Sequence, residues 1–302
     1  MSRHVAVLMG GWSAERQVSL TSGRACAAVL REQGYRVSEI DVGRDLAAVL
    51  LELKPDVVFN ALHGRWGEDG CVQGLLEIMG LPYTHSGVRA SANAMHKPTA
   101  KELYRRAGLA CAEGMTVSLD EARSQPPLAP PYVVKPTEEG STVGVRVVRP
   151  GDNIDPFVGW GYGDEVMFER YVPGRELSVA VMDERPLGVI EIEPLSGLYD
   201  YDAKYTDGLA VHYMPARVPD DIYQQAMDWA LQAHHVLGCR GVTRSDFRYD
   251  DSEGRGTGLY ILETNTQPGM TPLSLVPEIA AHREISFAAL VRWIVEDAGC
   301  DR

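Results

Sequence analysis

The sequence predicts an α/β protein of about two domains or more, with a parallel sheet first and antiparallel β layers after it. Strand and helix patterns alternate through the first third of the chain, and later segments alternate apolar with charged residues. The chain has 302 residues, of which 45% are hydrophobic and 24% are charged. These proportions are typical of a globular protein rather than a disordered or fibrous one.

The first third of the chain predicts a βαβαβ unit. Val5–Met9 is an apolar strand, and Ser13 is suited to cap a helix that ends at Gly34. The inward face of that helix is expected to carry Val18, Cys26, Ala28 and Val29. Two strands and a crossover helix between them complete a parallel sheet: Tyr35–Val42, Val57–Leu62 and Leu46–Leu53.

A second unit is predicted from about Ser91 onward. Met95–Ala107 has the pattern of one helix, and the glycine-rich segment Glu138–Gly144 separates the predicted strands Tyr132–Lys135 and Val145–Val148. The same periodicities predict further strands at Glu165–Val172, Glu176–Met182, Leu187–Glu193, Arg244–Asp250 and Leu259–Thr264. They also predict helices at Asp220–Leu237, capped by Asp220 or Asp221, and at Ser286–Ala298.

Charge and targeting signals limit the possible partners. Forty-two acidic and 29 basic residues give a formal net charge of −13, which disfavours nucleic acid and anionic lipid. The N-terminus lacks the apolar core of a signal peptide, and no apolar run approaches the ~18–20 residues of a membrane span. The five cysteines include no C-x-x-C pair, so reduced thiols are expected. We therefore expect a soluble cytoplasmic protein.

Three oxygen-bearing side chains fall on two neighbouring predicted strands. Glu263 and Asn265 are two positions apart, so they share one face of a strand, and Asp246 lies on the strand before it. Carboxylate and amide oxygens are the ligands that Mg²⁺ prefers, with phosphate oxygens completing the shell. These residues therefore fit a magnesium–nucleotide site. A solvated sheet edge is an equal alternative from spacing alone.

A lysine and a glycine-rich loop together suggest a phosphate site. Lys135 ends a strand just before Gly140–Gly144, whose N–H groups and hydroxyls can surround a phosphate. Lys97 and Lys204 are further candidate cations. The segment does not match the P-loop pattern, and an ordinary hairpin is the alternative.

Loops that follow apolar strands carry the remaining candidates. Glu15 is suited to an ammonium group and His63 to a carboxylate, because ligands of open parallel sheets bind at the carboxyl ends of the strands. Arg244 and the N–H of Gly269 are suited to an oxyanion, and Ser274 to a carboxylate. The alternatives are a structural histidine, a turn and a buried ion pair.

Taken in order, these motifs resemble the D-alanine–D-alanine ligase family of ATP-grasp enzymes. The matching segments span nearly the whole chain: G-G-W-S-A-E-R, H-G-R-W-G-E-D-G, Y-T-H-S-G-V, V-V-K-P-T-E-E-G-S-T-V-G, L-Y-D-Y-D-A-K-Y, G-V-T-R-S-D-F and E-T-N-T-Q-P-G-M-T. The resemblance implies an N-terminal Rossmann-like domain (1–95), a central ATP-grasp subdomain with a glycine-rich lid (96–172) and a C-terminal ATP-grasp subdomain (173–302).

The resemblance also implies a role for each candidate. ATP would contact Lys97, Lys135, Glu169, Tyr171, Val172, Glu176 and Lys204. Two Mg²⁺ ions, with Mn²⁺ as a substitute, would bind Asp246, Glu263 and Asn265. The first alanine would meet Glu15 and His63, and the second would meet Ser274 and Leu275 together with Arg244. The catalytic set would be Glu15, Ser141, Tyr205, Arg244 and Gly269.

The reaction implied is ATP-dependent joining of two D-alanines through an acylphosphate, for peptidoglycan synthesis, by an enzyme expected to be a homodimer. In the family, phenylalanine at the position of Tyr205 accompanies the use of D-lactate, so Tyr205 favours D-alanine. The alternatives are a D-alanine–D-lactate ligase, another carboxylate–amine ligase, and a nucleotide-binding regulatory protein without turnover. The presence of Glu15, Arg244 and Glu263 argues against the last.

Overall fold

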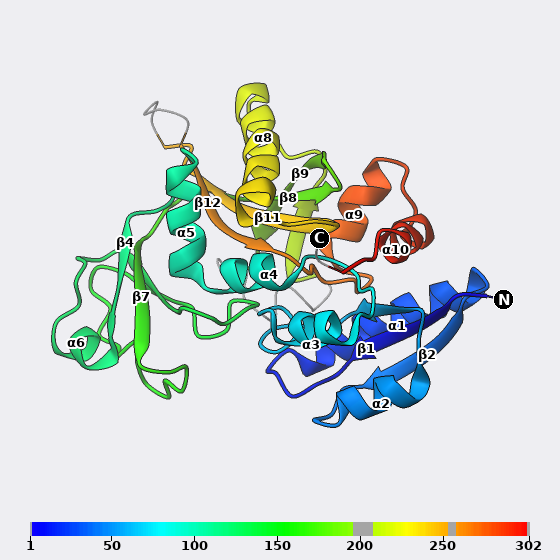
Figure 1. Cartoon of the computed structure of the whole chain (residues 1–302). Coiled ribbons are helices and arrows are strands. Elements are labelled where there is room, and N and C mark those ends of the chain that lie inside the picture. Colours follow the sequence, from blue (N-terminus) through cyan, green and yellow to red (C-terminus); the bar gives the residue numbers. More distant parts are fainter. Residues whose placement is uncertain (1, 196–207, 253–257, 301–302) are drawn as a thin grey trace.

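The computed structural model describes residues 2–195, 208–252 and 258–300, and three β-sheets lie within these ranges (Figure 1). The first sheet is parallel, with strand order β2-β1-β3, as predicted. Its unit comprises β1 (His4–Met9), α1 (Arg16–Glu32), β2 (Arg36–Asp41), α2 (Leu46–Leu53), β3 (Val57–Asn60) and α3 (Cys71–Met79).

The central strand of this sheet is apolar on both faces because helices cover both. Val5 and Val7 pack in the core that includes α1, whereas Ala6 and Leu8 pack in the core that includes α2 and α3. The alternation follows from the two-residue repeat of a strand. The loops that follow β1 and β3 are thereby fixed at one edge of the sheet.

The start of α1 differs from the prediction. The helix begins at Arg16 with Glu15 as its N-cap residue, so Ser13 does not cap it. Instead, Ser13 Oγ donates to the carbonyl oxygen of His63 at 2.6 Å and accepts from the Glu15 N–H at 3.2 Å. Ser13 thus joins the two loops. Ala28, predicted to face inward, is exposed.

The second sheet is antiparallel, with order β4-β7-β5-β6. Its strands are β4 (Gly114–Ser118), β5 (Tyr132–Pro136), β6 (Arg146–Val148) and β7 (Glu165–Arg170), and α6 (Leu119–Ser124) packs on it. The predicted hairpin around the glycine-rich loop is confirmed, because β5 pairs with β6. This layer projects away from the rest of the molecule on the side opposite the parallel sheet (Figure 1).

Two helices precede this sheet, where the sequence predicted one. They are α4 (Val88–Met95) and α5 (Lys97–Arg106). His96 between them has an extended backbone, with ψ of 93°, and its side chain accepts from the N–H of Thr99. Pro98 in the first turn of α5 suits a new helix start. Lys97 consequently occupies the first position of α5.

The third sheet is antiparallel, with order β10-β9-β8-β11-β12. Its strands are β8 (Arg175–Met182), β9 (Arg185–Pro194), β10 (Ala210–Tyr213), β11 (Val242–Tyr249) and β12 (Leu259–Asn265). Alternate residues of β8 face α5 and α8 (Asp220–Leu237) on one side. The other face packs on α9 (Leu275–His282) and α10 (Phe287–Glu296), in a core shared with the parallel sheet.

The structure therefore confirms the mixed α/β class with parallel and antiparallel sheets. Sequence patterns missed α3, β4, α6, β10 and α9, and the predicted aspartate cap of α8 is wrong because Pro219 precedes the helix and no side chain caps it. The boundaries of the three domains stay a prediction. Among the described residues, no helix combines the length and apolar character that a membrane crossing needs.

Candidate active site

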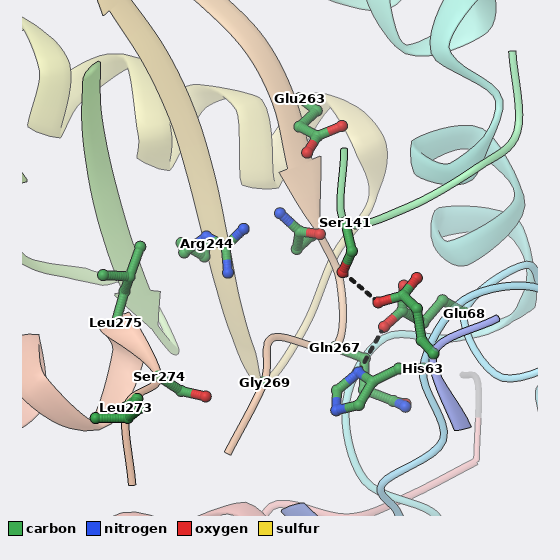
Figure 2. Close-up of a pocket in the computed structure, with 12 residues that line it drawn as sticks. His63, Glu68, Ser141, Arg244, Glu263, Gln267, Gly269, Leu273, Ser274 and Leu275 are labelled. Atoms are coloured by element: carbon green, nitrogen blue, oxygen red, sulfur yellow. Dashed lines mark hydrogen bonds and ion pairs between the residues drawn. The ribbon is translucent and has the colours of Figure 1, made fainter. Parts of the chain in front are cut away.

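A polar cavity lies where the loops after β1 and β3 meet the glycine-rich loop and the ends of β11 and β12 (Figure 2). The structure brings together there seven of the predicted catalytic and substrate-binding residues: Glu15, His63, Ser141, Arg244, Gly269, Ser274 and Leu275. Five other residues complete the lining: Glu68, Glu263, Asn265, Gln267 and Leu273.

The glycine-rich loop contacts the N-terminal unit through Glu15. Ser141 Oγ donates a hydrogen bond to Glu15 Oε2, as the dashed line in Figure 2 marks, and a side chain at Gly140 would overlap Glu15 Oε1. Ser141 and Thr142 both adopt positive φ, 47° and 63°, which non-glycine residues seldom do. The contact with Glu15 and the close approach at Gly140 define how the loop sits over the cavity.

His63 and Glu68 form a pair on the loop after β3, in which His63 is buried and Glu68 is partly buried. His63 Nδ1 lies 2.9 Å from Glu68 Oε1, and His63 Nε2 lies 3.2 Å from Ser22 Oγ. Burial opposes protonation of His63, but the hydrogen bond and charge of Glu68 outweigh it and raise the pKa of His63. Burial raises the pKa of Glu68 to about 7. Glu68 was not predicted, although it lies in the same H-G-R-W-G-E motif as His63.

Arg244 on β11 is oriented by Asp246. The Arg244 Nε and Nη2 atoms donate to the two Asp246 carboxylate oxygens, each at 2.7 Å, so the guanidinium is held in a bidentate pair. Asp246 also accepts from Ser178 Oγ at 2.6 Å. Within the described ranges the Gly269 N–H has no hydrogen-bond acceptor, so it is available to a ligand in the cavity.

The loop between β12 and α9 closes the cavity on its other side. Gln267 Nε2 donates to the carbonyl oxygen of Leu62, which fixes this loop to the N-terminal unit. Ser274 Oγ accepts from the N–H of Thr271 at 2.9 Å, and Leu275 is the buried first residue of α9. The positions of Ser274 and Leu275 thus depend on the start of α9, which the sequence patterns did not reveal.

A second cavity, of about 140 Å³, lies between the β5–β6–β7 layer and strands β11 and β12. It brings together six of the residues predicted for ATP: Lys97, Lys135, Glu169, Tyr171, Val172 and Glu176. Asp246 and Glu263 also line it, and Val133, Val145 and Val147 give it apolar walls. An elongated ligand with an apolar ring and a charged tail fits such a lining.

Two buried lysines, Lys97 and Lys135, line this second cavity. Lys97 Nζ lies 3.8 Å from Glu263 Oε2 and donates to the carbonyl oxygen of Glu139, which belongs to the glycine-rich loop. Burial lowers the pKa of Lys97, although the charge of Glu263 opposes this. Lys135 Nζ lies 2.5 Å from Glu169 Oε2. Both lysines therefore lie next to carboxylates and line the same cavity.

Glu169 lines the second cavity and forms ion pairs with two lysines. It is 3% exposed, and it accepts from Lys101 Nζ as well as from Lys135. Burial opposes ionisation of Glu169, but Lys135 and Lys101 outweigh it and lower the pKa of Glu169 to about 2. Lys101 was not predicted from the sequence. Its only signal is its spacing of four from Lys97, which places both on one face of α5.

The three predicted metal ligands lie together on β11 and β12. Asp246 and Glu263 are register partners, and Asn265 Nδ2 lies 3.3 Å from Asp246 Oδ2. Glu263 lines both cavities, so it marks where they join. In residues 2–195, 208–252 and 258–300, no group of three His, Cys, Asp or Glu side chains is arranged to hold a metal. The candidate site is accordingly two carboxylates and one amide.

Comparison with known proteins identifies the family. A family model described as the D-Ala–D-Ala ligase C-terminus matches residues 103–296, and one for the N-terminus matches residues 48–86. The chain belongs to the D-alanine–D-alanine ligase family. A D-alanine–D-alanine ligase of Parvibaculum lavamentivorans is 58% identical over 305 residues, covering 100% of this chain and 99% of the relative.

Solved structures of the D-alanine–D-alanine ligase family share the fold. A Bacillus anthracis D-alanine–D-alanine ligase is 30% identical, with a TM-score of 0.82 over 98% of this chain and 97% of that one. A structure of the B. anthracis enzyme complexed with ATP is 27% identical, with a TM-score of 0.81 and the same coverage. The ATP-grasp architecture expected from the motifs agrees with these matches.

Two residues predicted for the ligase site, Lys204 and Tyr205, lie outside the described residues. Their roles stay predictions. The remaining predicted site residues line one or both cavities. The residues that the patterns missed, Glu68 and Lys101, are paired with two of them, His63 and Glu169.

Proposed function

We propose that the chain joins two molecules of D-alanine into D-alanyl-D-alanine, with conversion of ATP to ADP and phosphate, and so supplies a peptidoglycan precursor. Family membership and 58% identity over the full chain support this function. The observation that carries it is the meeting of the two cavities at Glu263. An amino acid in one cavity and a nucleotide in the other would meet there.

In the first step, a carboxylate oxygen of the first D-alanine attacks the γ-phosphorus of ATP, and the bond to the bridging oxygen breaks to release ADP. This transfer depends on in-line positioning and neutralisation of charge more than on a covalent protein group. Lys97 and Lys135 supply positive charge. Glu15 holds the ammonium group of the alanine, and Ser141 keeps the glycine-rich loop against Glu15.

The donor set at the junction fits magnesium. Asp246, Glu263 and Asn265 would hold one or two Mg²⁺ ions, or Mn²⁺ in their place, because hard cations prefer carboxylate and amide oxygens. When bound, the metal neutralises the charge that develops on the transferring phosphoryl group. Arg244 forms an ion pair with the same Asp246 carboxylate. This ion pair would keep the guanidinium near the reacting carbonyl.

In the second step, the amine of the second D-alanine attacks the acylphosphate carbonyl. Arg244 and the Gly269 N–H stabilise the oxyanion, the carbon–oxygen bond to phosphate breaks, and the dipeptide forms. Arg244 and Ser274 hold the second carboxylate, with Leu275 beside it. His63, supported by Glu68, lies beside the first alanine. Closure of the glycine-rich loop would keep water from the acylphosphate.

The nucleoside would contact Glu176, Tyr171 and Val172, with Glu169 behind them and Lys204 near the phosphates. Tyr205 favours D-alanine over D-lactate as the second substrate. We further propose the domain ranges 1–95, 96–172 and 173–302, a homodimer, and a cytoplasmic location, where ATP is available.

Substrate dependence tests the function directly. Phosphate release from Mg-ATP should require D-alanine, and L-alanine should not replace it. D-alanyl-D-alanine should appear in step with ADP. Release that does not depend on D-alanine, or formation of the ester of D-alanine with D-lactate in preference to the dipeptide, would exclude this assignment. Absence of release would favour a nucleotide-binding protein without turnover.

Active-site variants test the residue roles. Glu263→Gln and Arg244→Ala should each lower dipeptide formation by at least about 100-fold, since each removes a charge at the reacting atoms. A rate near that of the wild type in either variant would remove that residue from the mechanism.

A further inference from the structure

Lys101 is a buried charge that neither the sequence motifs nor the two cavities explain. Its side chain is 1% exposed, and it extends from α5 to the carboxylate of Glu169 on β7. Lys101 Nζ also donates to the carbonyl oxygen of Ala112 at 2.7 Å. Lys101 does not line the second cavity, whereas Glu169, Lys135 and Lys97 do. Lys101 therefore reaches a ligand only through its partners that line the cavity, Ala112 and Glu169, and of these only Glu169 carries a charge.

Glu169 links two lysines by giving one carboxylate oxygen to each. Lys101 Nζ meets Oε1, and Lys135 Nζ lies 2.5 Å from Oε2. The β5 and β7 strands that carry Lys135 and Glu169 are hydrogen-bonded neighbours, so the arrangement is rigid. A buried carboxylate with two cationic partners leaves a net charge of +1 in the cluster.

This charge balance matters for a phosphate ligand. Among the described residues, the buried Glu169 carboxylate has two ion-pair partners, Lys101 and Lys135. Without Lys101, it would pair with Lys135 alone, and that pair would have no net charge. The positive charge that Lys135 presents to an anion would then be cancelled by Glu169 at close range, in a site where water screens little. Lys101 prevents this by neutralising Glu169 from the far side.

We propose that Lys101 is a positioning residue for ATP, which neutralises Glu169 so that Lys135 presents its charge to the triphosphate. This inference rests on the proposed function, because it takes ATP as the ligand of the cavity. It adds a residue to that site and predicts dependence on ligand charge. A purely structural role for Lys101 predicts no such dependence.

Calorimetric binding of ATP and of adenosine to the full-length protein separates the two roles. Lys101→Met should bind ATP about tenfold more weakly, because one charge near the phosphates is cancelled, and adenosine as tightly as the wild type does. Arg105→Met is the matched control: it removes one positive charge from the exposed side of the same helix and should change neither affinity. Equal loss for ATP and adenosine, or no loss for either, would overturn the proposal.

A paired variant keeps the test decisive if Lys101→Met folds poorly. Lys101→Met/Glu169→Gln removes opposite charges together, so the cluster keeps the same net charge of +1 through Lys135. The ratio of its ATP affinity to its adenosine affinity should stay within about threefold of the wild-type ratio, whatever contact Glu169 itself makes with the nucleoside. A ratio tenfold below that of the wild type would refute the charge argument.

The wild-type protein separates failure of this inference from failure of the proposed function. If wild type shows no D-alanine-dependent ADP formation, the proposed function fails. If wild type is active and the affinities of Lys101→Met do not depend on ligand charge, only the role of Lys101 fails.

Discussion

Replacing Gly140 by alanine would separate the glycine-rich loop from Glu15. A methyl group at Gly140 would overlap Glu15 Oε1, and Glu15 is only 5% exposed, so its carboxylate has little room to move. Gly140 does not have a positive φ, so alanine adds no backbone strain. The loop must therefore withdraw, and the hydrogen bond from Ser141 to Glu15 is lost.

The size of the effect follows from that hydrogen bond. A hydrogen bond to a charged group contributes about 1.5–3 kcal/mol. At ~1.4 kcal/mol for each tenfold change in rate, kcat/KM for D-alanine should fall roughly 10- to 150-fold. The free energy of unfolding should fall by no more than the same roughly 1.5–3 kcal/mol, because the loop belongs to none of the hydrophobic cores and only this hydrogen bond is lost.

The assay is ADP formation at saturating ATP over a range of D-alanine concentrations, with chemical denaturation of the same samples. Gly161→Ala is the control, because a methyl group there meets no atom within 4 Å and its φ is not positive. If Gly140→Ala has the same kcat/KM as Gly161→Ala, the loop does not act through Glu15.

Further predictions concern stability. The pKa of Glu169 is lowered from 4.5 to about 2, so the stability it contributes is present above about pH 4.5 and is lost as the pH falls through about 2. That contribution is about 3 kcal/mol at most, and Glu169→Gln should therefore show a smaller fall in unfolding free energy between pH 6 and about pH 3. An equal fall in both proteins would exclude Glu169 as the cause. Gly74→Ala should raise the unfolding free energy by about 0.5–1 kcal/mol with unchanged activity, since Gly74 lies within α3 and a methyl group there meets no atom within 4 Å. Unchanged or lower stability would contradict this.

Local sequence patterns predicted the structure where a single periodicity decides it. The two-residue spacing of Glu263 and Asn265 predicted a shared face, and their strand does pair with that of Asp246. The glycine-rich segment after Lys135 predicted the hairpin of β5 and β6. In both cases the relevant contacts lie between segments that a strand pattern and a turn pattern identify directly.

Contacts between segments that lie far apart in the sequence could not be predicted from these patterns. Lys101 is buried only because Glu169, 68 residues later, supplies its partner, and an isolated lysine on a helix is otherwise expected at the surface. The strands β4 and β10 are partly exposed edge strands without clear alternation, so they gave no signal. The break at His96 depends on a single side chain that accepts from the Thr99 N–H, which the apolar periodicity of the segment does not register.

Isotope transfer tests most directly whether the two cavities join an amino acid to a nucleotide. If D-alanine labelled with ¹⁸O in its carboxylate is the nucleophile, the attacking oxygen stays with phosphorus when the second amine displaces phosphate. Inorganic phosphate from the complete reaction should then carry one ¹⁸O atom for each dipeptide formed, as mass spectrometry would show. Phosphate free of label, with ADP formed at the same rate, would mean that water attacks ATP and would contradict the acylphosphate mechanism.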